Sequence, residues 1–190
     1  AFLRERCGLV SIHGPMVAAD LARPLDPLTA DWFPALLEGR APSRLVACEA
    51  DVLVPGRAEG PLVGGCLSLL AALAGSPWEF DYDGALLFIE EVGEEAYRVD
   101  RMLGTLLSSR RLGRPAGIIT GSMTRVTFGG AEDPGRLRDL HLDRLAPLGV
   151  PVASGLPFGH TGPNVPLPVG ARASWDGASR MLAFEEEFVS

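Results

Sequence analysis

The chain has 190 residues, of which 47% are hydrophobic, and it carries a formal net charge of −7 at pH 7. This length is enough for one sizeable hydrophobic core, or for one domain and part of another. The acidic balance excludes proteins that bind nucleic-acid backbones or anionic membrane surfaces, because those partners require a concentration of positive charge.

All 17 cationic residues are arginines. Without lysine, the chain cannot supply a serine–lysine dyad, a Schiff-base lysine or a phosphate-binding lysine. Its three cysteines are widely spaced and odd in number, which indicates neither a disulfide framework nor a zinc site. The apolar runs are too short to span a bilayer and the first residues do not resemble a signal peptide, so the expected location is the cytoplasm.

Residues 1–44 are predicted to be the end of one domain followed by a linker. The first residues resemble the last turns of a helix that ends at Gly8, and a short strand is expected at 9–12. A proline-rich connector follows, with a short helix at about 29–38. Because proteins seldom begin with the end of a helix, we expect the chain to be a fragment of a longer protein.

Residues 45–190 are predicted to form an α/β domain, because strand and helix patterns alternate along this part of the chain. The segment is expected to end in an antiparallel pair of strands separated by a turn near residues 175–179. The expected strands are 45–56, 84–92, 116–123, the segment beginning at 151, 165–176 and 180–188, and the expected helices are 64–75, 95–112 and 133–147.

Glu90 is the first candidate for chemistry, because it lies where an apolar strand ends. Leu86, Phe88 and Glu90 share one face of the strand. The carboxylate is therefore expected at the C-terminal edge of the sheet, where ligands bind in α/β folds. A strand that simply ends in solvated acids is the alternative interpretation.

His160 follows another apolar strand in the same way, with Gly159 and Gly162 on either side. An imidazole titrates near neutral pH and suits a general base, although a lone histidine in a loop also has ordinary structural explanations. His13 and His141 are weaker candidates, and His141 is expected on the surface of an arginine-rich and aspartate-rich helix. The three histidines lack the clustered spacing of a metal site.

A glutamate and a histidine at two strand ends could form the orienting acid and the base of a hydrolytic triad. The sequence contains no Gly-x-Ser-x-Gly nucleophile elbow. Ser68 and Ser122 are the best-placed hydroxyls, but neither lies on a sharp strand-to-helix turn. The residues alone therefore identify no nucleophile.

Five ordered blocks of the sequence resemble the serine LD-carboxypeptidases, which include muramoyl-tetrapeptide carboxypeptidases and microcin C immunity peptidases. The blocks are GLVSIHGPM, PGRAEGPLVGGCLSLLAALAGSPW, GALLFIEEVGEEAYRVDRML, GVPVASGLPFGH and VPLPVGARA. The resemblance implies a cytoplasmic, usually dimeric enzyme of two domains. Its Rossmann-like N-terminal domain carries the serine, and its swivelling β/β/α C-terminal domain carries the glutamate and histidine. Residues 1–44 then correspond to the tail of the first domain, and 45–190 to the second.

Carried over by motif, the resemblance makes Glu90, rather than Glu91, the triad acid and His160 the base. The family's serine lies in a G-x-S-D turn, which is expected before Ala1 and therefore on a missing N-terminal domain. No metal or cofactor is implied. One departure from the family pattern is Gly64-Gly65-Cys66, where the family has Gly-Gly-Asn, and this departure leaves the substrate preference open.

The resemblance allows more than one function. The leading expectation is removal of the terminal D-alanine from murein tetrapeptides during cell-wall recycling. The alternative is an immunity-type peptidase that cleaves peptidyl-adenylate analogues, for which Trp32 is the one suggestive aromatic clamp, although a hydrophobic anchor explains it equally well. A third possibility is a non-catalytic domain used for binding or dimerisation.

Overall fold

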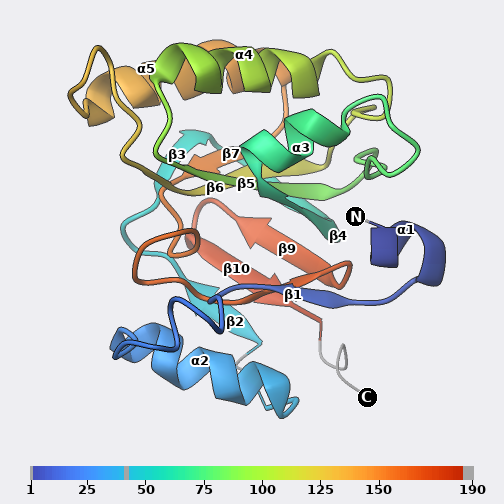
Figure 1. The fold of residues 1–190 in the computed structure, drawn as a ribbon. Coiled ribbons are helices and arrows are strands. Elements are labelled where there is room, and N and C mark those ends of the chain that lie inside the picture. Colours follow the sequence, from blue (N-terminus) through green and yellow to red (C-terminus); the bar gives the residue numbers. More distant parts are fainter. Residues whose placement is uncertain (1, 41–42, 186–190) are drawn as a thin grey trace.

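A computed structural model describes residues 2–40 and 43–185, and it shows a mixed α/β fold (Figure 1). Its main sheet has eight strands, of which four consecutive ones, β4, β5, β6 and β7, run parallel to one another, while the pairs β4–β9 and β7–β3 are antiparallel. The strands lie in the order β2 (Arg44–Val46), β10 (Met181–Phe184), β9 (Arg172–Asp176), β4 (Arg57–Cys66), β5 (Leu86–Val92), β6 (Gly117–Thr124), β7 (Val152–Ser154) and β3 (Asp51–Val54).

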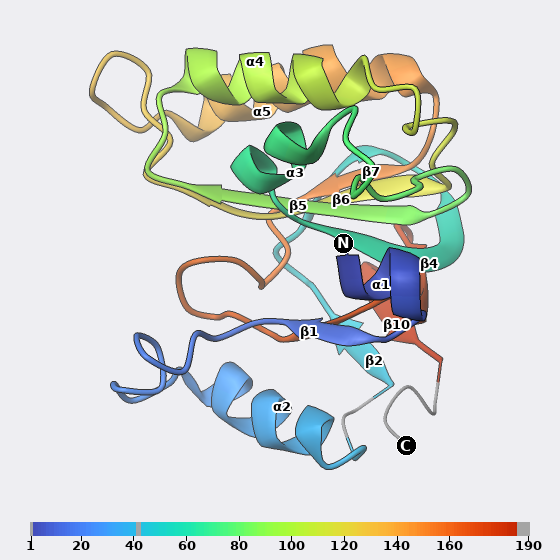
Figure 2. The same cartoon turned by 45° about the vertical axis from the view of Figure 1, so that its right-hand side comes forward.

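The elements are arranged in layers, which Figures 1 and 2 show from two directions. Three helices cover one side of the parallel strands, and the antiparallel strands β9, β10 and β2 lie on the other side. Beyond these strands lie a two-stranded sheet and a further helix. The helices are α3 (Leu67–Leu73), α4 (Ala96–Leu107) and α5 (Pro134–Leu145) on the first side and α2 (Pro27–Leu37) on the second, and the small sheet pairs β1 (Ser11–His13) with β8 (Leu167–Val169).

Strand β5 lies at the centre of the core. Its residues from Leu86 to Glu91 are all buried, because helices cover one face and the antiparallel strands the other. A strand enclosed on both faces is expected to be apolar throughout, as the sequence of this strand predicts. Two charged residues at its end are therefore unusual and direct attention to this edge of the sheet.

The predicted strand at 45–56 is wrong, because the segment forms two strands. A turn at 47–50, in which the Ala50 N–H donates to the Ala47 carbonyl at 2.9 Å, separates β2 from β3. The two strands then lie at opposite edges of the sheet. The alternating apolar pattern continues through the turn, so periodicity did not reveal the break.

The predicted helix at 64–75 begins three residues too early. Residues 57–66 form strand β4, which is not evident in the sequence because glycines and a proline occur along it, and α3 starts only at Leu67. Gly64 and Gly65 have φ angles of 153° and 149°, which favour glycine. Here Gly64 allows the strand to pass close to its neighbour, and the glycine pair does not mark a helix start.

The remaining elements differ mainly in length. Helix α4 ends at Leu107 instead of 112, and a 3₁₀ turn (η1, Ala146–Leu148) follows α5, whose predicted cap at Asp133 accepts a hydrogen bond from Arg136 N at 3.0 Å. The expected strand 165–176 is divided into β8 and β9. The antiparallel pair is confirmed, with Trp175 opposite Leu182, and positions 186–188 of the last predicted strand lie outside the described residues.

Residues before position 45 contact the rest of the chain through several elements. Helix α1 (Phe2–Cys7) ends at Gly8 as predicted, and β1 pairs with β8, placing His13 opposite Leu167. Thr29 Oγ1 accepts a hydrogen bond from Asn164 N at 2.8 Å, and Trp32 is buried. The division at residue 44 stays a prediction. In the described part of the chain, none of the helices has the length and apolar character needed to cross a bilayer.

The two adjacent glycines at the end of β4 offer a matched test of close packing. A Cβ atom on Gly64 would overlap the carbonyl oxygen of Phe88, whereas one on Gly65 would meet nothing within 4 Å. Both substitutions carry a similar φ penalty, so their difference isolates the clash. We expect Gly64→Ala to lower the free energy of unfolding by about 2 kcal/mol more than Gly65→Ala, measured by urea denaturation. Equal effects would contradict this packing.

Candidate active site

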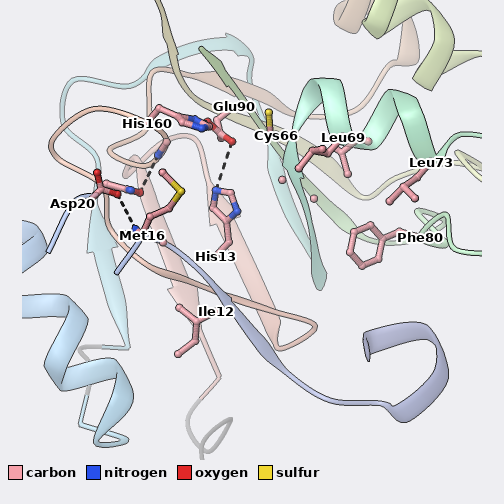
Figure 3. Close-up of a pocket in the computed structure, with 16 residues that line it drawn as sticks. Ile12, His13, Met16, Asp20, Cys66, Leu69, Leu73, Phe80, Glu90 and His160 are labelled. Carbon is pink, nitrogen blue, oxygen red and sulfur yellow. Dashed lines mark hydrogen bonds and ion pairs between the residues drawn. The ribbon is translucent and has the colours of Figure 1, made fainter. Parts of the chain in front are cut away.

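The structure brings Glu90 and His160 into direct contact. His160 Nδ1 lies 2.5 Å from Glu90 Oε2, although the two residues are 70 positions apart. The glutamate side chain is fully buried, whereas 36% of the histidine side chain is exposed. The imidazole therefore has one nitrogen on a buried acid and an open side from which another group can approach (Figure 3).

The loop after β7 holds His160 in place through its backbone. Ser122 N donates to the carbonyl of Phe158 at 2.7 Å, and Gly159 N donates to the side chain of Asn164 at 3.2 Å. The ring of Phe158 is buried against Phe88, with centroids 5.8 Å apart in an edge-to-face arrangement. Strand β5 thus anchors the loop beside the same strand end that presents Glu90.

The neighbouring acid Glu91 serves a different purpose. Successive side chains of a strand point to opposite faces, and Glu91 faces the start of α3. Its carboxylate accepts hydrogen bonds from Ser68 N at 2.8 Å, Val92 N at 2.9 Å and the Cys66 thiol at 3.4 Å. These donors explain how a second charge is buried beside the first, and they make Glu91 a cap for the helix rather than a partner of His160.

The environment of Glu90 is set by burial and by its histidine. Burial raises the pKa of its carboxyl group, and the hydrogen bond and charge of His160 act in the opposite direction. When the carboxylate accepts the Nδ1 proton, Nε2 of His160 carries the free lone pair. The pair is therefore arranged so that a proton can be accepted on the open side of the ring.

A second histidine also approaches Glu90. His13 Nε2 lies 3.7 Å from Glu90 Oε1 (Figure 3). Burial and the nearby His160 lower the pKa of His13 to about 4. Although the sequence makes His13 a weaker candidate than His160, the two share a feature: each follows an apolar stretch and is adjacent to a glycine, Gly14 and Gly159 respectively.

A cavity of about 440 Å³ opens beside these residues. One end is polar, and the other is formed by apolar side chains of α3 and the following loop. The polar end includes His13, Asp20, Cys66, Glu90, His160 and Asn164, and the apolar end includes Leu69, Leu70, Leu73 and Phe80. A pocket of this size holds a small peptide side chain or terminus next to the imidazole.

No nucleophile in the described ranges meets the imidazole. Among residues 2–40 and 43–185, no serine hydroxyl hydrogen-bonds to His160: Ser68 Oγ lies 3.1 Å from Cys66 Sγ, and Ser122 Oγ is buried without a partner. Burial raises the pKa of the Cys66 thiol, so this group is protonated at neutral pH. The described residues also contain no group of three or more His, Cys, Asp or Glu side chains placed to hold a metal ion.

The expectation that His141 lies on the surface is wrong. The residue is only 1% exposed, because it shares the inner face of α5 with Leu145, one helical turn away. Its Nδ1 atom lies 3.3 Å from Ser154 Oγ, and burial lowers its pKa to about 4. The arginines and aspartates around it in the sequence occupy the outer face of the helix. Their charge suggests an exposed helix, although His141 itself faces inward.

Residues 59–175 match the family model described as LD-carboxypeptidase C-terminal domain. The chain belongs to this family. A probable murein peptide carboxypeptidase of Bacillus subtilis is 35% identical over 96% of the chain and 58% of its own length. The crystal structure of a muramoyltetrapeptide carboxypeptidase from Oxalobacter formigenes superimposes with a TM-score of 0.73 at 33% identity, covering 92% of this chain and 60% of that one. The chain thus spans somewhat more than half the length of these relatives.

A further relative is the microcin C7 self-immunity protein of Escherichia coli, which is 27% identical over 71% of this chain and 39% of its own length. The family is therefore the one that the sequence blocks resembled, and the matched region is its C-terminal part, as expected. Both Glu90 and His160 lie inside the matched residues, whereas His13 precedes them.

The burial of His141 predicts how the free energy of unfolding changes at low pH. Its pKa is about 4 when folded but near 6.5 when unfolded, so only the unfolded chain binds this proton between those values. The stabilisation is present above pH 6.5 and is lost as the pH falls toward 4. The free energy of unfolding of the wild type should therefore fall between pH 7 and pH 4.5. We expect this fall to be about 2 kcal/mol smaller in His141→Gln, measured by urea denaturation at each pH.

The control for this experiment is Leu145→Ala, on the same buried face of α5. This substitution should destabilise the protein through lost packing by about 2–5 kcal/mol at every pH and leave the pH dependence unchanged. An unaltered pH dependence in His141→Gln would contradict the assignment of a neutral, buried imidazole.

Proposed function

We propose that this chain is part of a serine LD-carboxypeptidase that removes the terminal D-alanine from murein tetrapeptides during cell-wall recycling. In this proposal Glu90 and His160 are the acid and the base of a Ser-His-Glu triad. The observation that carries it is the 2.5 Å contact between a fully buried carboxylate and a part-exposed imidazole at the edge of a pocket. The names of the relatives, which are carboxypeptidases of murein peptides, support the substrate class.

The serine is proposed to come from a domain outside residues 1–190. Support comes from the hydroxyls in the described ranges, none of which reaches His160, and from the relatives, which are longer than the chain. His160 Nε2 would take the serine proton as the hydroxyl attacks the carbonyl carbon of the L-D peptide bond. Glu90 stabilises the imidazolium, which then protonates the departing amine of D-alanine.

Water completes the cycle. A water molecule loses a proton to His160 Nε2 and attacks the acyl-enzyme ester, and the imidazolium returns that proton to the serine oxygen as the shortened peptide leaves. No step requires a metal or an organic cofactor. We further propose that the enzyme acts in the cytoplasm as a homodimer, which rests on the family resemblance.

The immunity-type alternative has less support in the structure. Its suggestive residue was Trp32, but this side chain is only 5% exposed and its ring lies 6.3 Å from that of Phe184 in an edge-to-face contact. Trp32 is therefore better explained as a hydrophobic anchor than as a clamp for a base. Assays of the full-length protein with a murein tetrapeptide and with a peptidyl-adenylate analogue separate the two functions.

Adjacent glutamates allow a direct test of the proposed acid. In the full-length protein, Glu90→Gln should lower kcat by about 10³-fold, because an amide neither stabilises the imidazolium nor fixes its tautomer. Glu91→Gln should keep kcat within about threefold and act mainly on stability, by about 1–3 kcal/mol, since Glu91 caps α3. D-alanine release from the tetrapeptide is the measurement. Equal losses of kcat in both variants would reject the assigned roles.

The chain itself offers a second test. Residues 1–190 alone should release no D-alanine above background, because the proposed nucleophile is elsewhere. Addition of the separately produced serine domain is the complementary measurement, with Glu90→Ala and His160→Ala as controls. Turnover by the chain alone that survives both substitutions would overturn the proposal, and a complete lack of activity in the full-length protein would favour a non-catalytic binding domain.

A further inference from the structure

The carboxylate of Glu90 lies between two imidazole rings. His160 Nδ1 is 2.5 Å from Oε2, and His13 Nε2 is 3.7 Å from Oε1 (Figure 3). The proposed triad uses only the first of these contacts. The second comes from strand β1, outside the residues that match the family model.

The second oxygen of the carboxylate needs a partner. Glu90 Oε1 is buried and has no hydrogen bond in the described part of the chain, and leaving a buried acceptor unsatisfied is destabilising, more so when it is charged. The polar contact that the structure gives this oxygen is His13 Nε2, at a distance somewhat beyond a hydrogen bond.

His13 is fixed from two directions. Its backbone pairs with Leu167 in the β1–β8 sheet. Its ring packs against that of Phe88 in an edge-to-face arrangement, with centroids 5.2 Å apart and an interplanar angle of 60°. Because Phe88 lies two residues before Glu90 on the same face of β5, the contact that orients the His13 ring belongs to the strand that carries the acid.

Charge also favours a donor rather than a second base at this position. The pKa of His13 is lowered to about 4 by burial and by His160, so the ring is neutral near pH 7 and carries a single N–H. The other titratable groups that line the same cavity are Asp20, Cys66, Glu90 and His160. Of these, Glu90 offers the acceptor toward which Nε2 points, which places the proton of the neutral ring on Nε2.

We propose that His13 is a positioning residue whose Nε2–H supports Glu90 through Oε1, so that Oε2 is held ready to accept the proton of His160 Nδ1. This inference rests on the proposed roles of Glu90 and His160. It adds a fourth member to the constellation, one that acts on the acid rather than on the reacting atoms. It also assigns a purpose to the β1 segment, which precedes the matched domain.

The test uses three substitutions in the full-length protein. The side-chain amide of glutamine places an N–H near the position of Nε2, whereas asparagine reaches only to the position of Nδ1. Phenylalanine keeps the packing on Phe88 without a donor. We expect His13→Phe and His13→Asn to lower kcat by about tenfold with little change in KM, and His13→Gln to stay within about threefold of the wild type.

The pH dependence provides a readout that a purely structural role would not move. Without the donor on Oε1, the carboxylate holds more negative charge toward His160 and favours the imidazolium. The acid limb of the kcat/KM profile, which reports the pKa of the free base, should therefore move to higher pH in His13→Phe and His13→Asn but not in His13→Gln. His141→Gln is the control, since the pKa of His141 is likewise lowered to about 4 but the residue lies on α5, away from the cavity.

Nuclear magnetic resonance titration of ¹³C-labelled histidines in the full-length protein measures the same shift in His160 without any turnover. If the wild type lacks carboxypeptidase activity, the proposed function fails, and this titration still decides whether His13 acts on the pair. A His160 titration unchanged in His13→Asn, or a glutamine variant as impaired as the asparagine variant, overturns the inference. If His13→Phe does not fold, the glutamine and asparagine pair carries the test alone.

Discussion

The buried charge of Glu90 is the constraint around which the site is organised. Removing a carboxylate from water costs several kcal/mol unless partners compensate for the lost solvation. The fold meets this cost unevenly: one oxygen has a short contact to His160, and the other has only the more distant His13. The carboxylate is fully enclosed while the imidazole is partly exposed, so solvent cannot compete for the carboxylate, yet another molecule can still reach the imidazole.

Glu90 and Glu91 are consecutive residues of one strand, yet they make different kinds of contact. Glu90 and Glu91 are both buried at the end of β5, and the alternation of the strand sends them to opposite faces. Glu91 receives three donors from its surroundings and stabilises the start of α3. Glu90 receives fewer, which keeps its charge available to the imidazole. The two side chains are identical, so the number of hydrogen-bond donors around each carboxylate is what distinguishes the structural Glu91 from Glu90, which contacts the imidazole.

Much of this arrangement could be predicted from local sequence. Strand β5, helix α4 and the α5 cap follow from periodicity and capping residues, and Glu90 and His160 were selected because each ends an apolar strand. Strand β4 was missed because Gly60, Pro61 and the glycine pair disguise it, and its close approach to Phe88 is visible only in three dimensions.

The two other histidines failed as predictions for a related reason. His141 appeared exposed because its neighbours in sequence are charged, although its neighbour across the helix turn is the buried Leu145. His13 acquires its significance from Phe88 and Glu90, more than seventy positions later. Spacing along the chain carries little information about contacts of this kind, which depend on how distant strands are brought together.

The pairing of β1 with β8 has a consequence for how the protein is made. These strands come from opposite ends of the chain, and both flank the Glu90–His160 contact through His13 and the loop that precedes β8. Contacts between distant segments pay their closure entropy before they return any stabilisation, so they tend to form late. A ribosome releases β1 well before β8 has been synthesised. The strand pairing that positions His13 beside Glu90 can therefore form only after most of these 190 residues have been synthesised.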